Sequence, residues 1–178
     1  MQDFPEQGST ARLVMREVLR ASDAEAVCSL VRATGTFSTA EIALAASLVD
    51  DALQKGPRSE YRFLFGTLSE RLVGYSCYGA IAATESSFDL YWIVVSPDQQ
   101  RRGLGQLLLA RTEEQALALG GRRLYVETSS RPQYAHARAL YQRAGYVLVA
   151  TLEDFYAPGD HKTIYVKLLG PSGLSTMR

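Results

Sequence analysis

The stretch Asp89–Ala110 reads DLYWIVVSPDQQRRGLGQLLLA and decides the fold. Leu90–Val95 is a run of aromatic and β-branched residues, which favours a strand. Ser96–Asp98 interrupts that run, and Gln100–Gly105 then opens a Leu-rich helix. The stretch therefore predicts a strand and a helix joined by a turn that carries two glycines.

This turn has the features of an anion-binding site. Gly103 and Gly105 have no Cβ, so the backbone can approach a ligand closely. The first N–H groups of a helix have no partner inside it, and the helix dipole favours negative charge there. Arg101 and Arg102 add positive charge suited to phosphate. By themselves these residues fit an ordinary helix start equally well, because they match neither a dinucleotide fingerprint nor a P-loop.

Length and composition favour a single globular domain without a metal. The 178 residues carry a formal net charge of zero, which argues against a nucleic-acid or membrane partner. Neither Cys28 and Cys77 nor His136 and His161 have metal-ligand spacing, so we expect no metal. No signal peptide and no long apolar run is recognised, which predicts a cytoplasmic protein. We expect a domain at residues 11–169, between flexible tails at 1–10 and 170–178.

Hydrophobic patterning predicts the order β-α-α-β-β-β-α-β-α-β-β, hence an α/β (α+β) fold whose mixed sheet has helices on both faces. Two Ser-x-x-Glu sequences, beginning at Ser22 and Ser38, predict capping boxes at the first two helices. Strands are expected at residues 12–19, 61–68, 71–81, 90–95, 123–127, 146–152 and 162–169, and helices at residues 22–33, 38–54, 100–119 and 133–144.

Two motifs in this frame resemble those of the GNAT N-acetyltransferase family. The strand, the Val-x-Pro break and Gln-x-x-Gly-x-Gly resemble its acetyl-CoA-binding motif. Ala137–Tyr146 (ARALYQRAGY) resembles its second signature, with Leu-Tyr, Gly and an aromatic residue in place. The family's Asn falls on Tyr134, and the chain contains no Asn. The predicted element order is also that of the GNAT fold, which implies a mostly antiparallel central sheet over residues 12–169.

The resemblance implies acetyl-CoA as cosubstrate. In the family the glycine loop holds the pyrophosphate, and the end of the preceding strand pairs with the pantetheine arm. The implied cofactor-binding residues are Ile93, Val94 and Val95 on the strand, Gln100, Arg101, Arg102, Gly103, Leu104, Gly105 and Gln106 in the loop, and Tyr134 and Tyr141 downstream.

Amide formation from a thioester needs a neutral amine, a polarised carbonyl and a proton for the departing thiolate. The resemblance implies that Tyr141 is the proton donor and that the backbone N–H near Val95 polarises the carbonyl. Glu127, at the end of an apolar strand, is our candidate for the base that accepts the amine proton. Asp89 is the alternative, and either carboxylate equally fits a solvated strand end.

The predicted function is transfer of acetyl from acetyl-CoA to a primary amine of a small molecule, by direct attack in a ternary complex. Alternatives are a protein N-terminal or lysine acetyltransferase, a non-catalytic CoA-binding regulator and a nucleic-acid-binding module. Family members place acceptor walls where we find Phe37 and the segment Phe155–Asp160, and Trp92 is a further aromatic candidate. Proteins of the family are often dimers, so a homodimer is compatible with the resemblance.

Overall fold

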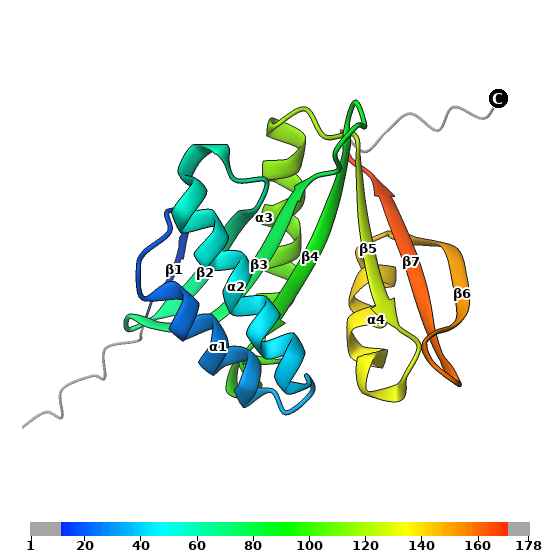
Figure 1. Ribbon diagram of the computed structural model, residues 1–178, viewed down its shortest axis with the longest axis horizontal. Coiled ribbons are helices and arrows are strands. Elements are labelled where there is room, and N and C mark those ends of the chain that lie inside the picture. The colour runs from blue at the N-terminus through cyan, green and yellow to red at the C-terminus, as the bar shows by residue number, and fades with distance from the viewer. Residues whose placement is uncertain (1–11, 171–178) are drawn as a thin grey trace, which may run out of the picture.

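A seven-stranded sheet in the order β1-β2-β3-β4-β5-β7-β6 crosses the protein, with α1 and α2 on one face and α3 and α4 on the other (Figure 1). This computed structural model describes residues 12–170. The elements are β1 (Leu13–Arg16), α1 (Asp23–Ala33), α2 (Thr39–Lys55), β2 (Arg62–Leu68), β3 (Arg71–Ala80), β4 (Ser87–Val95), α3 (Leu104–Ala118), β5 (Arg123–Ser129), α4 (Ala135–Arg143), β6 (Val147–Ala157) and β7 (Asp160–Leu168).

The predicted order of elements and the mixed sheet are confirmed. Within residues 12–170, only β4 and β5 run parallel, and the other neighbouring strands are antiparallel. The predicted tails at 1–10 and 170–178 lie outside the described residues, except for Gly170. Within the described range, each helix is too short or too polar to cross a bilayer.

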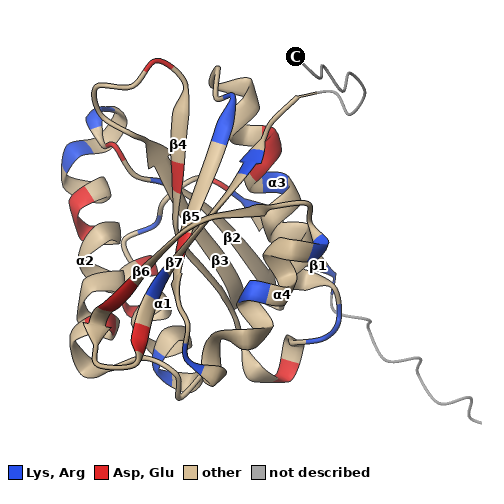
Figure 2. Cartoon of the chain, turned by 90° about the vertical axis from the view of Figure 1, so that its right-hand side faces the viewer, with Lys and Arg blue, Asp and Glu red and all other residues tan. Residues whose placement is uncertain are grey.

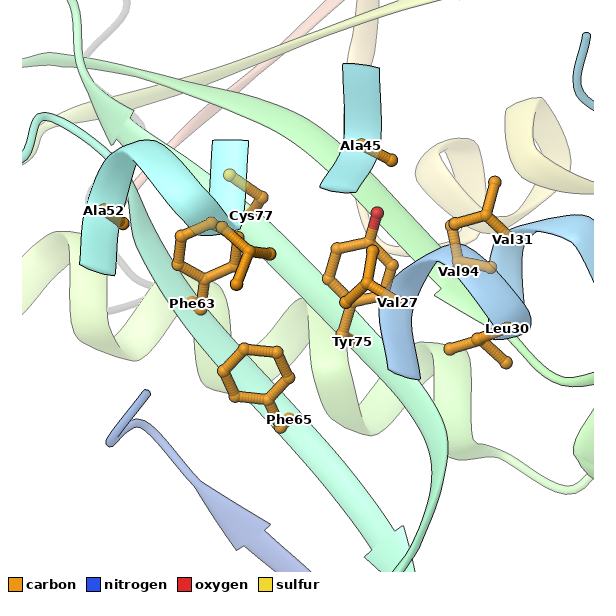
Figure 3. Packing of buried hydrophobic residues seen from close by; sticks show 11 residues of the cluster. Val27, Leu30, Val31, Ala45, Ala52, Phe63, Phe65, Tyr75, Cys77 and Val94 are labelled. Carbon is orange, nitrogen blue, oxygen red and sulfur yellow. The ribbon is translucent and has the colours of Figure 1, made fainter. Parts of the chain in front are cut away.

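The first core lies between the sheet and the helices α1 and α2 (Figure 3). Phe63 and Phe65 of β2 are two residues apart, so their rings point to the same face and stack at 5.6 Å. Tyr75 and Cys77 of β3 join them, both fully buried. The helices contribute Val27, Leu30 and Val31 from α1 and Ala45, Val49 and Ala52 from α2. Because this core buries β2, β3 and the end of β4, it fixes the half of the sheet next to the predicted anion site.

The opposite face is covered by α3 and α4. Leu109 of α3 and Tyr141 of α4 pack in one cluster with Phe88 of β4 and Leu124 of β5. Leu108 of α3 joins a neighbouring cluster under β2 and β3. These contacts hold the start of α3 against the end of β4, where the glycine turn connects them.

Of the two predicted capping boxes, one is confirmed and the other is wrong. Ser38 accepts the Glu41 N–H, and the Glu41 carboxylate accepts the Ser38 N–H, as the motif requires. Ser22 has helical dihedral angles, and its side chain makes no capping hydrogen bond, so the residue continues the helix instead of capping it. There the Asp23 carboxylate accepts the Arg20 N–H at 2.7 Å and pairs with Arg16 of β1. A tertiary ion pair thus replaces the local cap.

The prediction of a loop around residues 153–161 is also wrong. β6 continues to Ala157 and β7 begins at Asp160, so Pro158 and Gly159 form a tight hairpin turn. The hairpin is irregular between Leu152 and Ala157, where the pairing register shifts. Asp154 has a positive φ of 51° in that irregular part. Polar residues there reflect an edge strand exposed to solvent and not a long connection.

Candidate active site

The sheet opens between β4 and β5, the only parallel pair among the described strands. Their register extends from Ser87 opposite Arg123 to Leu90 opposite Val126 and then stops, although both strands continue (Figure 1). On the other side of β4, Leu90 pairs with Tyr78 and Trp92 with Cys77, so Tyr91 is an extra, bulged residue. A bulge bends its strand and ends pairing locally. Within the described residues, the edge of β4 beyond Leu90 that faces β5 is therefore free of a strand partner.

A cleft of about 860 Å³ occupies this opening. It is lined by the start of α2, the middle of β4, the end of β5, the segment before α4, and the hairpin of β6 and β7. A smaller cavity of about 260 Å³ near Ser59 and Leu119 shares no lining residue with it. The larger cleft gathers the candidate acid, both candidate bases and most of the predicted acceptor wall in one place.

The glycine turn follows the end of β4 and has the backbone geometry expected of an anion-binding loop, here called the cradle. Gly103 is the residue before α3 and has φ +84°, and Arg101 also has a positive φ of 59°. The Leu107 N–H donates to the Gly103 carbonyl at 3.0 Å, which is the first hydrogen bond of the helix. The N–H groups that precede Leu107 at the helix start have no acceptor inside the helix and point outward. Alternating backbone conformations of this kind direct several N–H groups to one point. The donors suit a pyrophosphate.

Side chains of the loop brace it against the strand. The Gln100 amide donates to the Val95 carbonyl at 3.2 Å. The Asp98 carboxylate accepts hydrogen bonds from the Arg71 guanidinium at 2.6 Å and from the Ser96 hydroxyl at 2.7 Å. The hydrogen bond from Arg71 lowers the pKa of the Asp98 carboxyl well below its ordinary value, and the hydrogen bonds from Gln99 and Ser96 add to this effect. Sequence reasoning missed the ion pair between Arg71 and Asp98, because Arg71 lies on β3, far from Asp98 in the chain.

The residues predicted to bind the cofactor differ in whether their side chains are buried or exposed. Val94 and Leu104 are 3% and 6% exposed and direct their side chains into the core, so they can offer only backbone groups. Arg101 and Arg102 are exposed beside the cradle. The outward N–H groups of the cradle and its two arginines suit the charged pyrophosphate of acetyl-CoA. The unpaired edge of β4 suits the extended pantetheine arm.

Tyr141 lies on α4 and is 4% exposed, and it lines the cleft. Its ring packs against Tyr146 and Tyr165, with centroids 5.8 and 6.1 Å away. Burial raises the pKa of Tyr141 well above its ordinary value, so the phenol keeps its proton at neutral pH. Among the described residues its hydroxyl has no hydrogen-bond partner in the protein. A neutral, unengaged phenol at a cleft is a suitable proton donor.

The two candidate bases both line the cleft. Glu127 lies within β5 and not at its end, and it pairs with Lys162 at 2.7 Å while remaining 47% exposed. Asp89 is half-buried, and its pKa is raised by burial first and by the charge of Glu127 second, with Lys162 opposing. This candidate base therefore already has a partner, because β7 supplies Lys162. The raised pKa makes Asp89 easier to protonate than an ordinary aspartate.

The predicted acceptor wall is present in part. Phe37, Trp92 and Tyr156 line the cleft, and Phe37 packs on Trp92 at 5.1 Å. Tyr134 meets Phe37 edge-on at 6.2 Å. Phe155 does not reach the cleft and instead lies against the Lys162 ammonium, 3.7 Å from the ring centroid.

Sequence reasoning missed the Tyr61–Tyr91 pair at the cleft and the contacts of Asp160, a residue that it had placed in the acceptor wall. Tyr61 and Tyr91 pack edge-on at 5.4 Å along its β4 side. Asp160 is buried, accepts the Ser129 hydroxyl and pairs with Arg131 at 2.9 Å. These pairs join segments far apart in the chain, so no local signal could have found them. Among residues 12–170, no three His, Cys, Asp or Glu side chains gather as metal ligands would.

Comparison with known proteins agrees with this geometry. Residues 27–146 match the family model described as Acetyltransferase (GNAT) family. A crystal structure of a GNAT family protein from Desulfovibrio desulfuricans is 40% identical, with a TM-score of 0.87 over 89% of this chain and 100% of that one. No curated protein sequence matches the chain.

More distant structures share the fold alone. The ribosomal-protein-S18-alanine N-acetyltransferase from Escherichia coli is 18% identical, with a TM-score of 0.71 over 94% of this chain and 100% of that one. An aminoglycoside 6'-N-acetyltransferase complexed with coenzyme A is also 18% identical, with a TM-score of 0.70 over 90% of this chain and 99% of the other.

Proposed function

The chain belongs to the GNAT family of acetyltransferases, and we propose that it transfers the acetyl group of acetyl-CoA to a primary amine of a small molecule, by direct attack in a ternary complex. One observation carries this proposal: the sheet opens at Leu90, beside the anion cradle, into a cleft that also holds the buried phenol of Tyr141. Cofactor site, acceptor space and proton donor thus adjoin one another.

We assign the cofactor contacts to the residues that the sequence indicates. Backbone N–H groups of the loop 100–106 hold the pyrophosphate, and Arg101 and Arg102 neutralise it. Ile93, Val94 and Val95 offer the free edge of β4 to the pantetheine arm. Acetyl-CoA supplies the acetyl group as an activated thioester. Tyr134 occupies the position of the family's Asn, and its ring, packed on Phe37, takes a place in the cleft wall instead of that amide contact.

In the chemical step, Glu127 accepts the amine proton through water, with Asp89 as the alternative acceptor. Tyr141 donates its proton to the departing sulfur. Holding the amine beside the thioester can contribute about 7–11 kcal/mol, and a proton-transfer group about 10²–10⁴-fold in rate. Positioning therefore outweighs each single side chain, and loss of one carboxylate lowers the rate without abolishing it.

The size of the cleft favours a small acceptor. Its volume of about 860 Å³ falls within the range of about 300–1,000 Å³ typical of small-molecule sites. In the view of Figure 2, basic and acidic segments are interspersed over the described part of the chain. Nothing in that distribution favours a charged macromolecule as acceptor, so a protein N-terminus or lysine is the second choice.

The test measures thiol release from acetyl-CoA with a panel of primary amines. We expect release that depends on the amine, and loss of CoA binding in Gly103→Glu by calorimetry. Gly120→Glu is the matched control: Gly120 has φ +87°, and like Gly103 it has no atom within 4 Å of an added Cβ. Both variants carry the same backbone strain, but only one lies in the cradle.

Two results would contradict the proposal. Equal CoA affinity in the Gly103 and Gly120 variants would remove the cradle assignment. A tight CoA complex that releases no thiol with any amine would instead support a non-catalytic CoA-binding regulator.

A further inference from the structure

The cleft carries more negative charge than the protein neutralises. Four carboxylates line it, and two of them have partners: Glu127 pairs with Lys162 and Asp160 pairs with Arg131. Among residues 12–170, Asp89 and Glu41 take part in no ion pair. Two negative charges therefore remain for a ligand to meet.

Titrating groups in the cleft respond to this charge. Burial, and then the charge of Asp89, raises the pKa of Tyr91 to about 12. The pKa of Tyr156 is raised by burial first, then by Glu127 and Asp160. These tyrosines lie on β4 and β6, on two sides of the opening. Carboxylates therefore lie near tyrosines on both of these strands.

Hydrogen bonds hold one carboxylate oxygen of Glu41 in place and leave the other available to a ligand. Its Oε2 accepts both the backbone N–H and the hydroxyl of Ser38, at 2.8 and 2.7 Å. Within the described residues, Oε1 accepts no hydrogen bond. Because the capping box fixes the side chain, a ligand that meets Oε1 finds a preorganised anion at low entropic cost.

Aromatic rings line the same cleft as the two unpaired carboxylates. Phe37 packs on Trp92 and Tyr134, and Tyr61 packs on Tyr91, all at the cleft. Ring faces attract cations, as Lys162 over Phe155 already illustrates in this protein. The walls therefore favour the same ligand charge as the carboxylates.

An independent feature marks where the reacting end of the ligand lies. The Tyr141 side chain is 4% exposed, borders the cleft, and has a hydroxyl without a protein partner among the described residues. Because this hydroxyl is accessible from the cleft and is free to donate, it suits a ligand atom at that point. The cleft thus has a reacting end marked by Tyr141 and a separate anion at Glu41.

We propose that the acceptor is an amine with at least two positive charges: one nitrogen is acetylated near Asp89 and Tyr141, and a second, cationic nitrogen binds Glu41. This rests on the proposed function and names its substrate class. A flexible diamine and a rigid aminosugar share this chemistry, and the test below separates them. An acceptor with a carboxylate in place of the second nitrogen is repelled.

The test compares α,ω-diamines of three to eight carbons with the monoamines of the same length and with 5-aminopentanoate, using thiol release from acetyl-CoA. Kanamycin serves as the rigid, polycationic probe. We expect kcat/KM for the best diamine or for kanamycin to exceed that of the monoamines by about tenfold, as for one charge-assisted hydrogen bond. Which of these two probes is the better substrate decides between a flexible and a rigid acceptor.

The variant Glu41→Gln removes the charge but keeps the cap, because Gln also serves in a capping box. We expect it to raise KM for the dication about tenfold and to leave kcat near its original value, with a smaller change in KM for the monoamines. Glu114→Gln is the matched control, since Glu114 is exposed on α3 and lies outside the cleft. It should change none of these values.

Equal kcat/KM for dications and monoamines would overturn the dicationic acceptor while leaving the acetyltransferase reaction intact. The same holds if Glu41→Gln and Glu114→Gln behave alike. Absence of thiol release with every amine would instead defeat the proposed function. Calorimetric titration of 1,5-diaminopentane into the CoA-saturated protein gives a readout besides turnover, and binding unaffected by Glu41→Gln would also overturn the inference.

Discussion

Replacing Tyr141 by Phe removes one oxygen from the site and leaves the ring in place. The aromatic contacts with Tyr146 and Tyr165, at 5.8 and 6.1 Å, are retained. The hydroxyl donates to no protein group among the described residues, so its loss should change the free energy of unfolding by less than about 1 kcal/mol. If it protonates the departing sulfur, however, kcat should fall by about 10²-fold or more, equivalent to about 2.7 kcal/mol in the barrier.

Tyr146→Phe is the matched control for this experiment. Tyr146 is 3% exposed, packs on Tyr141 and also has a buried hydroxyl without a partner among the described residues, but it does not line the cleft. We expect turnover near that of the original protein and equal or slightly greater stability, because an unsatisfied buried group is removed.

The assay is thiol release under saturating amine and acetyl-CoA, with CoA affinity from calorimetry and stability from urea unfolding. A kcat unchanged in Tyr141→Phe would refute the role of Tyr141 as acid. An equal loss in both tyrosine variants would attribute the effect to packing of α4 and not to proton transfer.

Three further predictions concern the base, the sheet and alkaline stability. Glu127→Gln should lower kcat/KM at neutral pH by about 10²-fold, with recovery at high pH where the amine is already neutral; if only Asp89→Asn has this effect, Asp89 is the base. Gly79→Ala should destabilise the protein by about 1–3 kcal/mol in urea unfolding, because the added Cβ would lie 2.3 Å from the Glu60 carbonyl oxygen, and an unchanged midpoint would contradict that packing. Burial raises the pKa of Tyr78 to about 12, so the unfolded chain ionises first and stability should fall as pH rises from about 10 to about 12. Tyr78→Phe should reduce that slope, and stability that is flat over this range would show that the ring is not buried.

Local patterns were decisive for the elements and for the cofactor loop. Ser38-x-x-Glu41 predicted a capping box that the structure contains, and the strand, turn and helix around Gly103 lie where the residues indicated. The same pattern at Ser22 failed, because Arg16 of β1 engages Asp23 and the serine keeps helical dihedral angles. A sequence motif competes with tertiary ion pairs that the motif itself does not encode.

The sequence by itself determined the order of elements, the mixed sheet and the turn whose N–H groups point outward, since each depends on residues within a few positions of one another. Only the tertiary structure decided that β4 and β5 separate after Leu90, that Lys162 neutralises Glu127, and that Asp89 and Glu41 face one cleft unpaired. The physical reason is range: dihedral preferences and helix-end hydrogen bonds act along the chain. Charge pairing and desolvation act through space between strands and helices that the sequence brings together only on folding.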